Sequence, residues 1–322
     1  MKALVSGSNG FIGSHLVETL RKRGYSVTCL VRKTSNLDWL KGLDVEFVCG
    51  DCTEKETLYE AVKGADYVYH LAGVVRAVDR DTYYRVNFLG TKNLLEVCNE
   101  TNPNMKKFIY LSTQAAVGPF DPEAKGDCHP ITDYGKSKLQ GEMAVNSFKD
   151  RLPVLTIRTT AIYGPRDKDI YTYFKFLKKG LRPVPGNVDG DINLLYVGDL
   201  IEGMILAAEN ESSSGQTYFL ADEKSYSWEE ASDKAAQALG VKAINVRIPR
   251  WMILTSAFLS ELSSGITNKP PLLDRQKAKE ILHDGWFCDI TEARERLGFK
   301  PRVSLEEGLK ITASWYKEKG WL

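Results

Sequence analysis

The sequence predicts an α/β fold, a doubly wound parallel sheet followed by a smaller, mostly helical C-terminal domain. In the first half of the 322-residue chain, short apolar runs alternate with amphipathic stretches. A glycine-rich turn, SGSNGFIG, directly follows the first apolar run. Alternation of this kind is typical of a parallel sheet that is covered by helices on both faces.

Each apolar run reads as a buried strand, and each amphipathic stretch between two runs reads as a helix. Helices are expected at 11–24, 56–65 and 83–100, where apolar residues recur at helical spacing. The strands are expected, in order, at 2–7, 25–31, 45–49, 65–73, 106–112 and 152–158.

The pattern changes after residue 165, where we expect a domain boundary. Residues 1–165 should form the first domain and residues 166–322 the second. Glycine and proline become frequent, a strand-like stretch follows at 193–199, and the remainder reads as largely helical. Segments within 193–222 are candidates for crossing back to the sheet.

Charge and composition narrow the partners and the location. Lys and Arg number 43 against 42 Asp and Glu, and no long run carries one sign, so composition gives no case for nucleic acid or an anionic membrane. The start has no signal-peptide pattern and no apolar run reaches transmembrane length, so we expect a cytoplasmic protein without stable membrane insertion. Cys49 and Cys52 lack a second ligand pair, which favours a structural role and no metal site.

The glycine-rich turn predicts a dinucleotide site. Gly7, Gly10 and Gly13 are spaced as G-x-x-G-x-x-G between the first strand and the first helix. The first glycine permits a tight turn, the second lets the backbone approach a pyrophosphate, and the third allows close helix–strand packing. The helix N-terminus then faces the phosphates. We therefore expect residues 1–165 to bind a dinucleotide and residues 166–322 to bind the substrate.

The residues after the second strand bear on the choice between NADP and NAD. A carboxylate there would bind the ribose hydroxyls of NAD, whereas this chain has Arg32 and Lys33. An arginine can bind a 2′-phosphate with two hydrogen bonds. NADP(H) is therefore favoured, and NAD(H) stays open.

Tyr134 and Lys138 stand one helical turn apart in ITDYGKSKLQGE. Positions i and i+4 lie on the same face of a helix, so a phenol and an ammonium group can converge on one ligand. The pair alone is more often a solvated surface feature than an active site. Other landmarks of the sequence decide between the two.

Together these landmarks resemble the extended short-chain dehydrogenase/reductase superfamily of the NAD-dependent epimerase/dehydratase type, which has a Rossmann fold. The resemblance spans nearly the whole chain. It rests on the three glycines, Gly50-Asp51, HLAG (70–73), Asn87 in YRVNFLGTKNLLE, LSTQAAVG (111–118), Tyr134 with Lys138, IYGPR (162–166) and the tail at 289–316.

The resemblance implies the roles of the catalytic residues. Tyr134 would exchange a proton with a carbonyl or carbinol oxygen. Lys138 would lower the pKa of the phenol and bind the nicotinamide ribose. Thr113, five residues before Gly118, would polarise the substrate oxygen, with Ser112 as a fallback. Asn87 would support the surroundings of the tyrosine.

The resemblance also implies the cofactor wall and the oligomeric state. Asp51 and Cys52 should lie at the adenine, and Ala72 and Gly73 near the phosphates and the nicotinamide ribose. A homodimer is expected through the two long helices that include 83–100 and 134–148. Further cofactor contacts are implied, by motif position, for Asn9, Phe11, Ile12, Leu71 and Ile162, together with Tyr134 and Lys138 themselves.

The type of reaction is narrowed by what the chain lacks. Related dehydratases carry Asp-Glu after the threonine, where this chain has Gln114-Ala115. Nucleotide-sugar epimerases commonly have an arginine where this chain has Ile192, followed here by Asn193, and an asparagine where it has Ala161. Cations that would compensate from elsewhere include Arg166 and Arg182.

The segments 30–51 and 269–299 are most similar to the dihydroflavonol-reductase and 3β-hydroxysteroid-dehydrogenase-like branch. With the apolar cluster of IPRWMILTSAFLSEL (248–262), read either as a core helix or as a pocket wall, this favours an NADP(H)-dependent oxidoreductase acting on an apolar carbonyl or alcohol. Two alternatives remain. One is a nucleotide-sugar epimerase with tightly bound NAD, and the other is a non-catalytic NADP-binding regulatory protein, which would more often lack the tyrosine.

Overall fold

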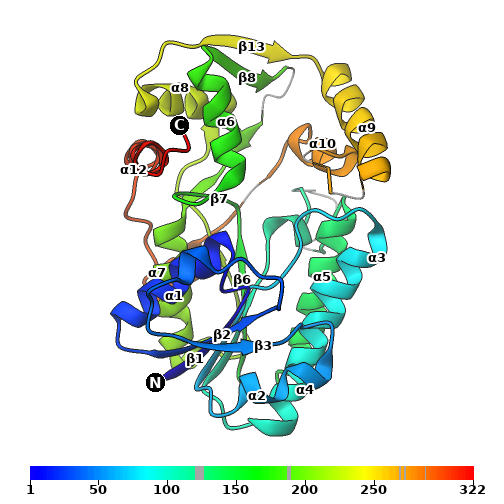
Figure 1. Cartoon of the computed structure of the whole chain (residues 1–322), viewed down its shortest axis with the longest axis vertical. Coiled ribbons are helices and arrows are strands. Elements are labelled where there is room, and N and C mark those ends of the chain that lie inside the picture. Colours follow the sequence, from blue (N-terminus) through cyan, green and yellow to red (C-terminus); the bar gives the residue numbers. More distant parts are fainter. Residues whose placement is uncertain (120–126, 187–189, 268–269, 272, 287) are drawn as a thin grey trace.

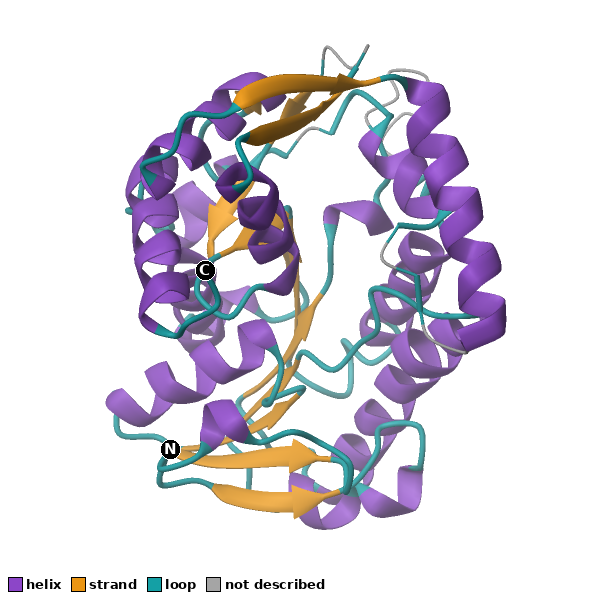
Figure 2. Ribbon diagram, turned by 45° about the horizontal axis from the view of Figure 1, so that its top comes forward, coloured by secondary structure: helices purple, strands orange, loops and turns teal. Residues whose placement is uncertain are grey.

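A seven-stranded, entirely parallel sheet forms the centre of the computed structural model, which describes residues 1–119, 127–186, 190–267, 270–271, 273–286 and 288–322. The order β11-β6-β5-β4-β1-β2-β3 runs outward from β1 in both directions, as in doubly wound sheets (Figures 1 and 2). The strands are β1 (Lys2–Ser6), β2 (Ser26–Val31), β3 (Glu46–Cys49), β4 (Tyr67–His70), β5 (Lys107–Leu111), β6 (Val154–Thr159) and β11 (Thr217–Leu220).

Helices cover both faces of this sheet. Alternate side chains of each strand point to opposite faces, so apolar residues on both faces must be covered. Ala3 and Val5 of β1 enter one core, and Leu4 enters the other. The first core is closed by α1 (Phe11–Lys22), α7 (Val197–Glu209) and α11 (Thr291–Leu297). The second is closed by α2 (Tyr59–Val62), α4 (Gly90–Thr101) and α5 (Asp133–Asn146), and α3 (Arg80–Tyr83) precedes a π-helical segment, Tyr84–Leu89, that leads into α4.

The doubly wound parallel fold predicted from the sequence is confirmed, with two local corrections. The third strand is not buried: β3 is the outermost strand, and Phe47 on it is 44% exposed. The stretch 193–199 is a strand only at β10 (Leu194–Tyr196), since α7 already begins at Val197. The compared segment 269–299 includes residues 269, 272 and 287, which lie outside the described residues.

The remaining elements build a second unit with its own core. Phe174, Tyr163 and Tyr316 are buried there between α6 (Lys168–Lys178), α8 (Trp228–Leu239) and α12 (Leu305–Glu318). Short strand pairs accompany these helices, so the unit is mixed rather than purely helical. They are β7 (Ala161–Tyr163) with β10, β8 (Leu181–Pro185) with β13 (Ile244–Ile248), and β9 (Asp191–Ile192) with β12 (Tyr226–Ser227).

Two further helices form a separate pair beside this unit. The helices α9 (Arg250–Thr267) and α10 (Arg275–Ile281) enclose a small core of Ile253, Ala257, Ala278 and Leu282. Figure 1 places α9 and α10 on the same side of the molecule as α3 and α5. Within the described part of the chain, no helix is long and apolar enough to cross a bilayer.

Candidate active site

The glycine turn is so tight that two of its positions, Gly7 and Gly13, have no space for a side chain. Gly7 has φ +70°, and a Cβ there would lie 2.8 Å from the Ala72 backbone nitrogen. A Cβ on Gly13 would lie 2.1 Å from the Gly7 carbonyl oxygen. The neighbours are backbone atoms that cannot move aside, so only glycine fits. Gly10 caps α1 without a side-chain hydrogen bond, which leaves the N–H groups of the first helical turn available to an anion.

Arg32, Asp51 and Cys52 lie together at the ends of β2 and β3. The Asp51 carboxylate accepts hydrogen bonds from the Thr53 backbone nitrogen (2.8 Å) and hydroxyl (2.9 Å). Burial raises the pKa of the Cys52 thiol to about 12, with the Asp51 charge raising it further and the Arg32 charge lowering it. The Arg32 guanidinium and the adjacent Lys33 side chain are exposed, and Asn9 reaches across to the Asn36 carbonyl at 3.3 Å.

Asn87 ties the segment after β4 to the helix that carries the tyrosine. Its side chain is 1% exposed, accepts a hydrogen bond from the Val74 nitrogen (2.8 Å) and donates to the Val74 carbonyl (3.0 Å). It also donates to the Ser137 hydroxyl at 2.9 Å, and that hydroxyl donates to the Tyr134 carbonyl at 2.7 Å. Asn87 therefore holds the Leu71–Ala72–Gly73 wall in a fixed position relative to α5.

Gly135 brings Tyr134 against the loop that follows β5. A Cβ on Gly135 would lie 2.1 Å from the Ala115 carbonyl oxygen, so only glycine permits this approach. Burial raises the pKa of the Tyr134 phenol, and a hydrogen bond with the Thr113 hydroxyl, at the start of that loop, offsets part of the rise. The two hydroxyls thus meet at the carboxyl edge of the sheet, where ligands bind in folds of this kind.

Lys138 lies one helical turn beyond Tyr134, and its expected effect on the pKa of the phenol stays a prediction. Burial raises the pKa of the Tyr134 phenol, and the Glu280 carboxylate adds to that rise. The Lys138 ammonium donates a hydrogen bond to the Leu111 carbonyl (2.6 Å) and lies 4.1 Å from the centre of the Tyr110 ring. Burial lowers the pKa of Lys138 to about 7, so its protonated and neutral forms are both populated at physiological pH.

The Ser112 hydroxyl is hydrogen-bonded to a buried ion pair. It donates to the Glu142 carboxylate, which also pairs with the Arg158 guanidinium at 2.6 Å. Of the two candidate hydroxyls, that of Thr113 contacts Tyr134 and that of Ser112 bonds Glu142.

The apolar residues of the predicted cofactor wall have another environment: each is half-buried and packs against the first core. These are Phe11, Ile12, Leu71 and Ile162.

Comparison with known proteins decides the family. The model of the NAD dependent epimerase/dehydratase family matches residues 3–221. The chain belongs to this family. Its members are NAD(P)-dependent dehydrogenases, reductases and epimerases, and the resemblance to the extended short-chain dehydrogenase/reductase superfamily is confirmed.

The similarity of this chain to known relatives covers nearly its whole length. The chain is 28% identical to a ceramide reductase of Caulobacter vibrioides, covering 99% of this chain and 95% of the relative. It is also 28% identical to a mouse sterol-4-alpha-carboxylate 3-dehydrogenase, covering 97% and 90%. A crystal structure of a UDP-glucose 4-epimerase with UDP-glucose from Thermotoga maritima matches with a TM-score of 0.80 and 25% identity over 99% of both chains.

Two residues near Tyr134 were not identified from the sequence. Glu280 on α10 hydrogen-bonds the Thr132 hydroxyl at 3.0 Å, and its charge reaches the Tyr134 phenol. The Tyr83 ring centre lies 6.3 Å from that of Tyr134. Neither position belongs to a short motif, and only the packing of α10 on α5 brings Glu280 to the tyrosine. The similarity of 269–299 to one branch is a signal that this segment matters, without saying where it lies.

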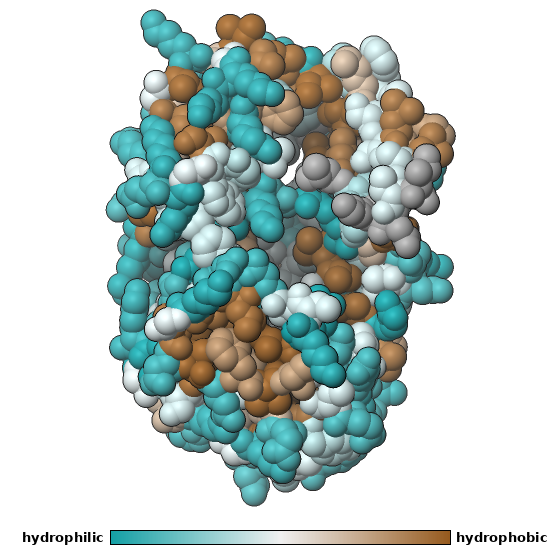
Figure 3. All heavy atoms as spheres, viewed as in Figure 1, coloured by the Kyte–Doolittle hydropathy of each residue, from teal (hydrophilic) through white to brown (hydrophobic). Residues whose placement is uncertain are grey.

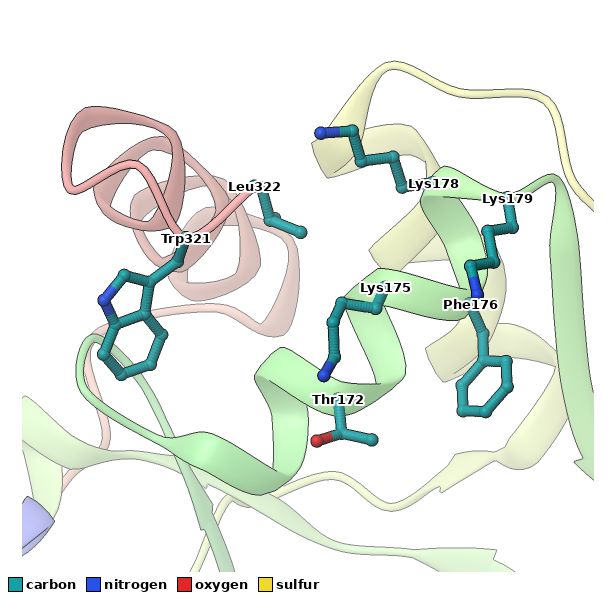
Figure 4. A pocket seen from close by; sticks show the side chains of 7 residues that line it. All are labelled: Thr172, Lys175, Phe176, Lys178, Lys179, Trp321 and Leu322. Carbon is teal, nitrogen blue, oxygen red and sulfur yellow. The ribbon is translucent and has the colours of Figure 1, made fainter.

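One surface pocket lies outside the predicted site. It measures about 630 Å³ and is lined from α6 and the C-terminus by residues that include Lys175, Phe176 and Trp321 (Figure 4). None of the predicted cofactor or catalytic residues lines it. The candidate active site is instead the region marked by the glycine turn and the Thr113–Tyr134 pair. In the described part of the chain, no cluster of His, Cys, Asp or Glu is suited to a metal ion.

Proposed function

We propose that this family member is an NADP(H)-dependent oxidoreductase that interconverts a carbonyl and an alcohol on a hydrophobic substrate. Residues 1–165 would bind the cofactor, most of 166–322 would supply the substrate side, and α4 and α5 would join two copies. The choice of substrate rests on one observation. The residues that could bind the diphosphate of a nucleotide sugar are either apolar or already bonded to other residues of the protein.

Those groups are apolar or already engaged. Ile192 packs against the core of the second unit, between α6, α8 and α12. The Asn193 side chain is hydrogen-bonded to Thr160 (3.1 Å), Asp222 (2.8 and 3.0 Å) and the Lys224 carbonyl (3.0 Å).

The two arginines that would compensate are also engaged. Arg166 forms an ion pair with Glu18 and donates to the Ser14 hydroxyl at 2.9 Å. Arg182 forms an ion pair with Asp233. Recruiting either cation to a diphosphate would break an existing ion pair, so the site is poorly prepared for a nucleotide sugar.

The residues around Tyr134 are suited to proton exchange at a substrate oxygen. The bound nicotinamide would supply or accept the hydride. Thr113 would donate a hydrogen bond to the oxygen, and the Tyr134 phenol would give or take its proton. The Tyr134 phenol, whose pKa burial raises, is protonated at neutral pH and has a proton to give to a carbonyl oxygen.

Two further observations support this proposal. Arg32 is exposed beside Asp51 and Cys52, forms no ion pair within the described part of the chain, and is available to a 2′-phosphate. Two relatives, a ceramide reductase and a sterol-4-alpha-carboxylate 3-dehydrogenase, are named after lipid substrates. An amphiphilic or lipid-like carbonyl compound is therefore the substrate class we favour.

A screen of NADPH oxidation tests the proposal. Aromatic ketones, steroids, 3-oxo lipids and nucleotide sugars are offered to the wild-type protein and to Tyr134→Phe. We expect turnover of at least one apolar carbonyl by the wild type and none by the variant. Epimerisation of UDP- or dTDP-sugars, with every apolar carbonyl refused, would contradict the proposal.

The second candidate is a nucleotide-sugar epimerase with tightly bound NAD, favoured by the likeness to the UDP-glucose 4-epimerase. Its signature would be NAD that stays with the protein through purification. Denaturing the purified protein and assaying the supernatant for NAD and NADP distinguishes the two, since we expect no stoichiometric NAD. A third possibility, a regulatory protein that binds NADP without turnover, would show cofactor binding and no oxidation with any carbonyl.

A further inference from the structure

The helix α9 presents a hydrophobic face to the outside. Among the large apolar side chains at 248–262, only Ile253 is buried, together with the small Ala257. Trp251 is 67% exposed, Phe258 46% and Leu259 59%. The expectation of a core helix is therefore wrong for most of this segment. Figure 3 shows hydrophobic residues along the upper right of the molecule, where Figure 1 places α9.

The exposed apolar residues form one stripe. Successive residues of a helix are rotated by about 100°, so positions i, i+7 and i+11 lie close together on one face. Trp251, Phe258 and Leu262 occupy these positions, and Met252, Leu254 and Leu259 flank them. The residues packed on α10, Ile253 and Ala257, lie on the opposite side. We call the six exposed residues the α9 stripe.

Basic residues stand at the N-terminal end of the α9 stripe. Arg250 begins α9 and is exposed, and Arg247 precedes it on β13, exposed and paired with Glu229 at 3.4 Å. Glu261, the acidic residue within α9, is paired with Arg275 at 2.6 Å. Arg250 therefore leaves this end of the stripe positive, although the whole chain has a formal net charge of only +1. Composition averages over the surface and hides this local pattern.

We propose that the α9 stripe docks on the surface of an anionic phospholipid bilayer. Trp, Phe and Leu on one face of a helix, with cations at its edge, are the features of helices that lie in the interface between acyl chains and headgroups. The helix would lie along the surface and would not span it. Arg250, with Arg247 beside it, would contact headgroup phosphates.

The position of α9 links this surface to the active site. On its inner side α9 packs against α10, and Glu280 and Gln276 of α10 hydrogen-bond Thr132 and Asp133 at the start of α5. One helix thus separates the bilayer from the turn that carries Tyr134. This proposal extends the proposed function, since a lipid-like carbonyl would reach the site from the bilayer. Vesicle binding is measured without substrate or cofactor, so its failure is distinct from a failure of that function.

Co-sedimentation with vesicles tests the proposal. The probes are vesicles of phosphatidylglycerol and phosphatidylcholine in equal parts, and vesicles of phosphatidylcholine alone. We expect the wild-type protein to pellet with the mixed vesicles and several-fold less with phosphatidylcholine alone. Trp251→Ser/Phe258→Ser/Leu259→Ser should lose at least about tenfold in binding. The control is Phe176→Ser, which changes a comparably exposed phenylalanine on α6 (43%) and should leave binding unchanged.

Three results would overturn the proposal. One is a wild-type protein that stays in the supernatant with mixed vesicles. Another is a triple variant that binds as the wild type does while its circular dichroism is unchanged. The third is a wild-type dimer that the triple variant converts to a monomer in sedimentation velocity without any vesicle binding, which would make the α9 stripe a contact between two copies.

Discussion

At the scale of single residues, the candidate site depends on a glycine that permits close packing and on an asparagine that forms several hydrogen bonds. Gly135 allows α5 to approach Ala115, and this approach sets the Tyr134 phenol beside the Thr113 hydroxyl. Asn87 fixes the wall after β4 through Val74 and Ser137. The sequence suggested which residues matter, while their hydrogen-bond partners became apparent only in three dimensions.

Replacing Arg32 tests the cofactor preference. Because the guanidinium would bind the 2′-phosphate, Arg32→Ala should raise the Kd for NADPH by about tenfold or more and change that for NADH little. Fluorescence titration with both cofactors measures the ratio, and Lys41→Ala, a lysine elsewhere on the surface, serves as the control. An equal loss for both cofactors would remove the 2′-phosphate role.

The buried His70 makes stability dependent on pH. Its ring contacts the Ser6 and Thr91 hydroxyls (2.7 and 3.0 Å), and burial lowers its pKa to about 3. The unfolded chain binds a proton at this histidine below about pH 6.5 and the folded chain does not. Stability is therefore fully present above about pH 6.5 and falls toward pH 3.

From this residue we expect a loss of about 1.4 kcal/mol per pH unit below pH 6.5. Urea unfolding at pH 7 and pH 5.5 measures the loss, and the smaller pH dependence expected of His70→Gln isolates the contribution of the histidine. The same pH dependence in both proteins would assign the effect to other groups.

At the scale of elements, α10 is the piece that sequence reasoning placed least well. The strands β1, β2, β4, β5 and β6 were predictable because their apolar runs and the glycine turn are local signals. The contact of α10 with α5 joins residues more than a hundred positions apart, as in the bond between Gln276 and Asp133. No local periodicity records such a contact. The exposed face of α9 was missed for a similar reason, because an apolar residue in a sequence does not state what covers it.

Glu280 should tune the proton transfer at Tyr134. Its negative charge disfavours the phenolate, so Glu280→Gln should lower the pKa of the phenol. The pH at which alcohol oxidation reaches half its maximal rate should fall by about one unit. Glutamine keeps an acceptor for the Thr132 hydroxyl, which limits the structural effect. Glu292→Gln on α11 is the control, and an unshifted profile would show that Glu280 only holds the helix.

At the scale of the whole molecule, the parallel sheet gathers the functional groups along one edge. Gly7, Arg32, Cys52, Gly73 and Thr113 all follow the carboxyl ends of strands. The sequence predicted this edge, since the order of strands and the glycine turn define a doubly wound fold. Segments within 193–222 were candidates for a return to the sheet, and α7 and β11 lie there. The sequence did not predict that α11 also packs on the first core, because that helix carries no motif that marks its partner.

The central claim is that Tyr134 exchanges a proton with the oxygen of an apolar carbonyl compound while NADPH is oxidised. Stopped-flow fluorescence of bound NADPH in a single turnover, with the best carbonyl from the screen, tests it most directly. We expect rapid oxidation by the wild type. For Tyr134→Phe we expect a rate lower by at least about 10²-fold, with the Kd for NADPH within about twofold of the wild-type value. A Tyr134→Phe protein that oxidises NADPH at the wild-type rate would contradict the account.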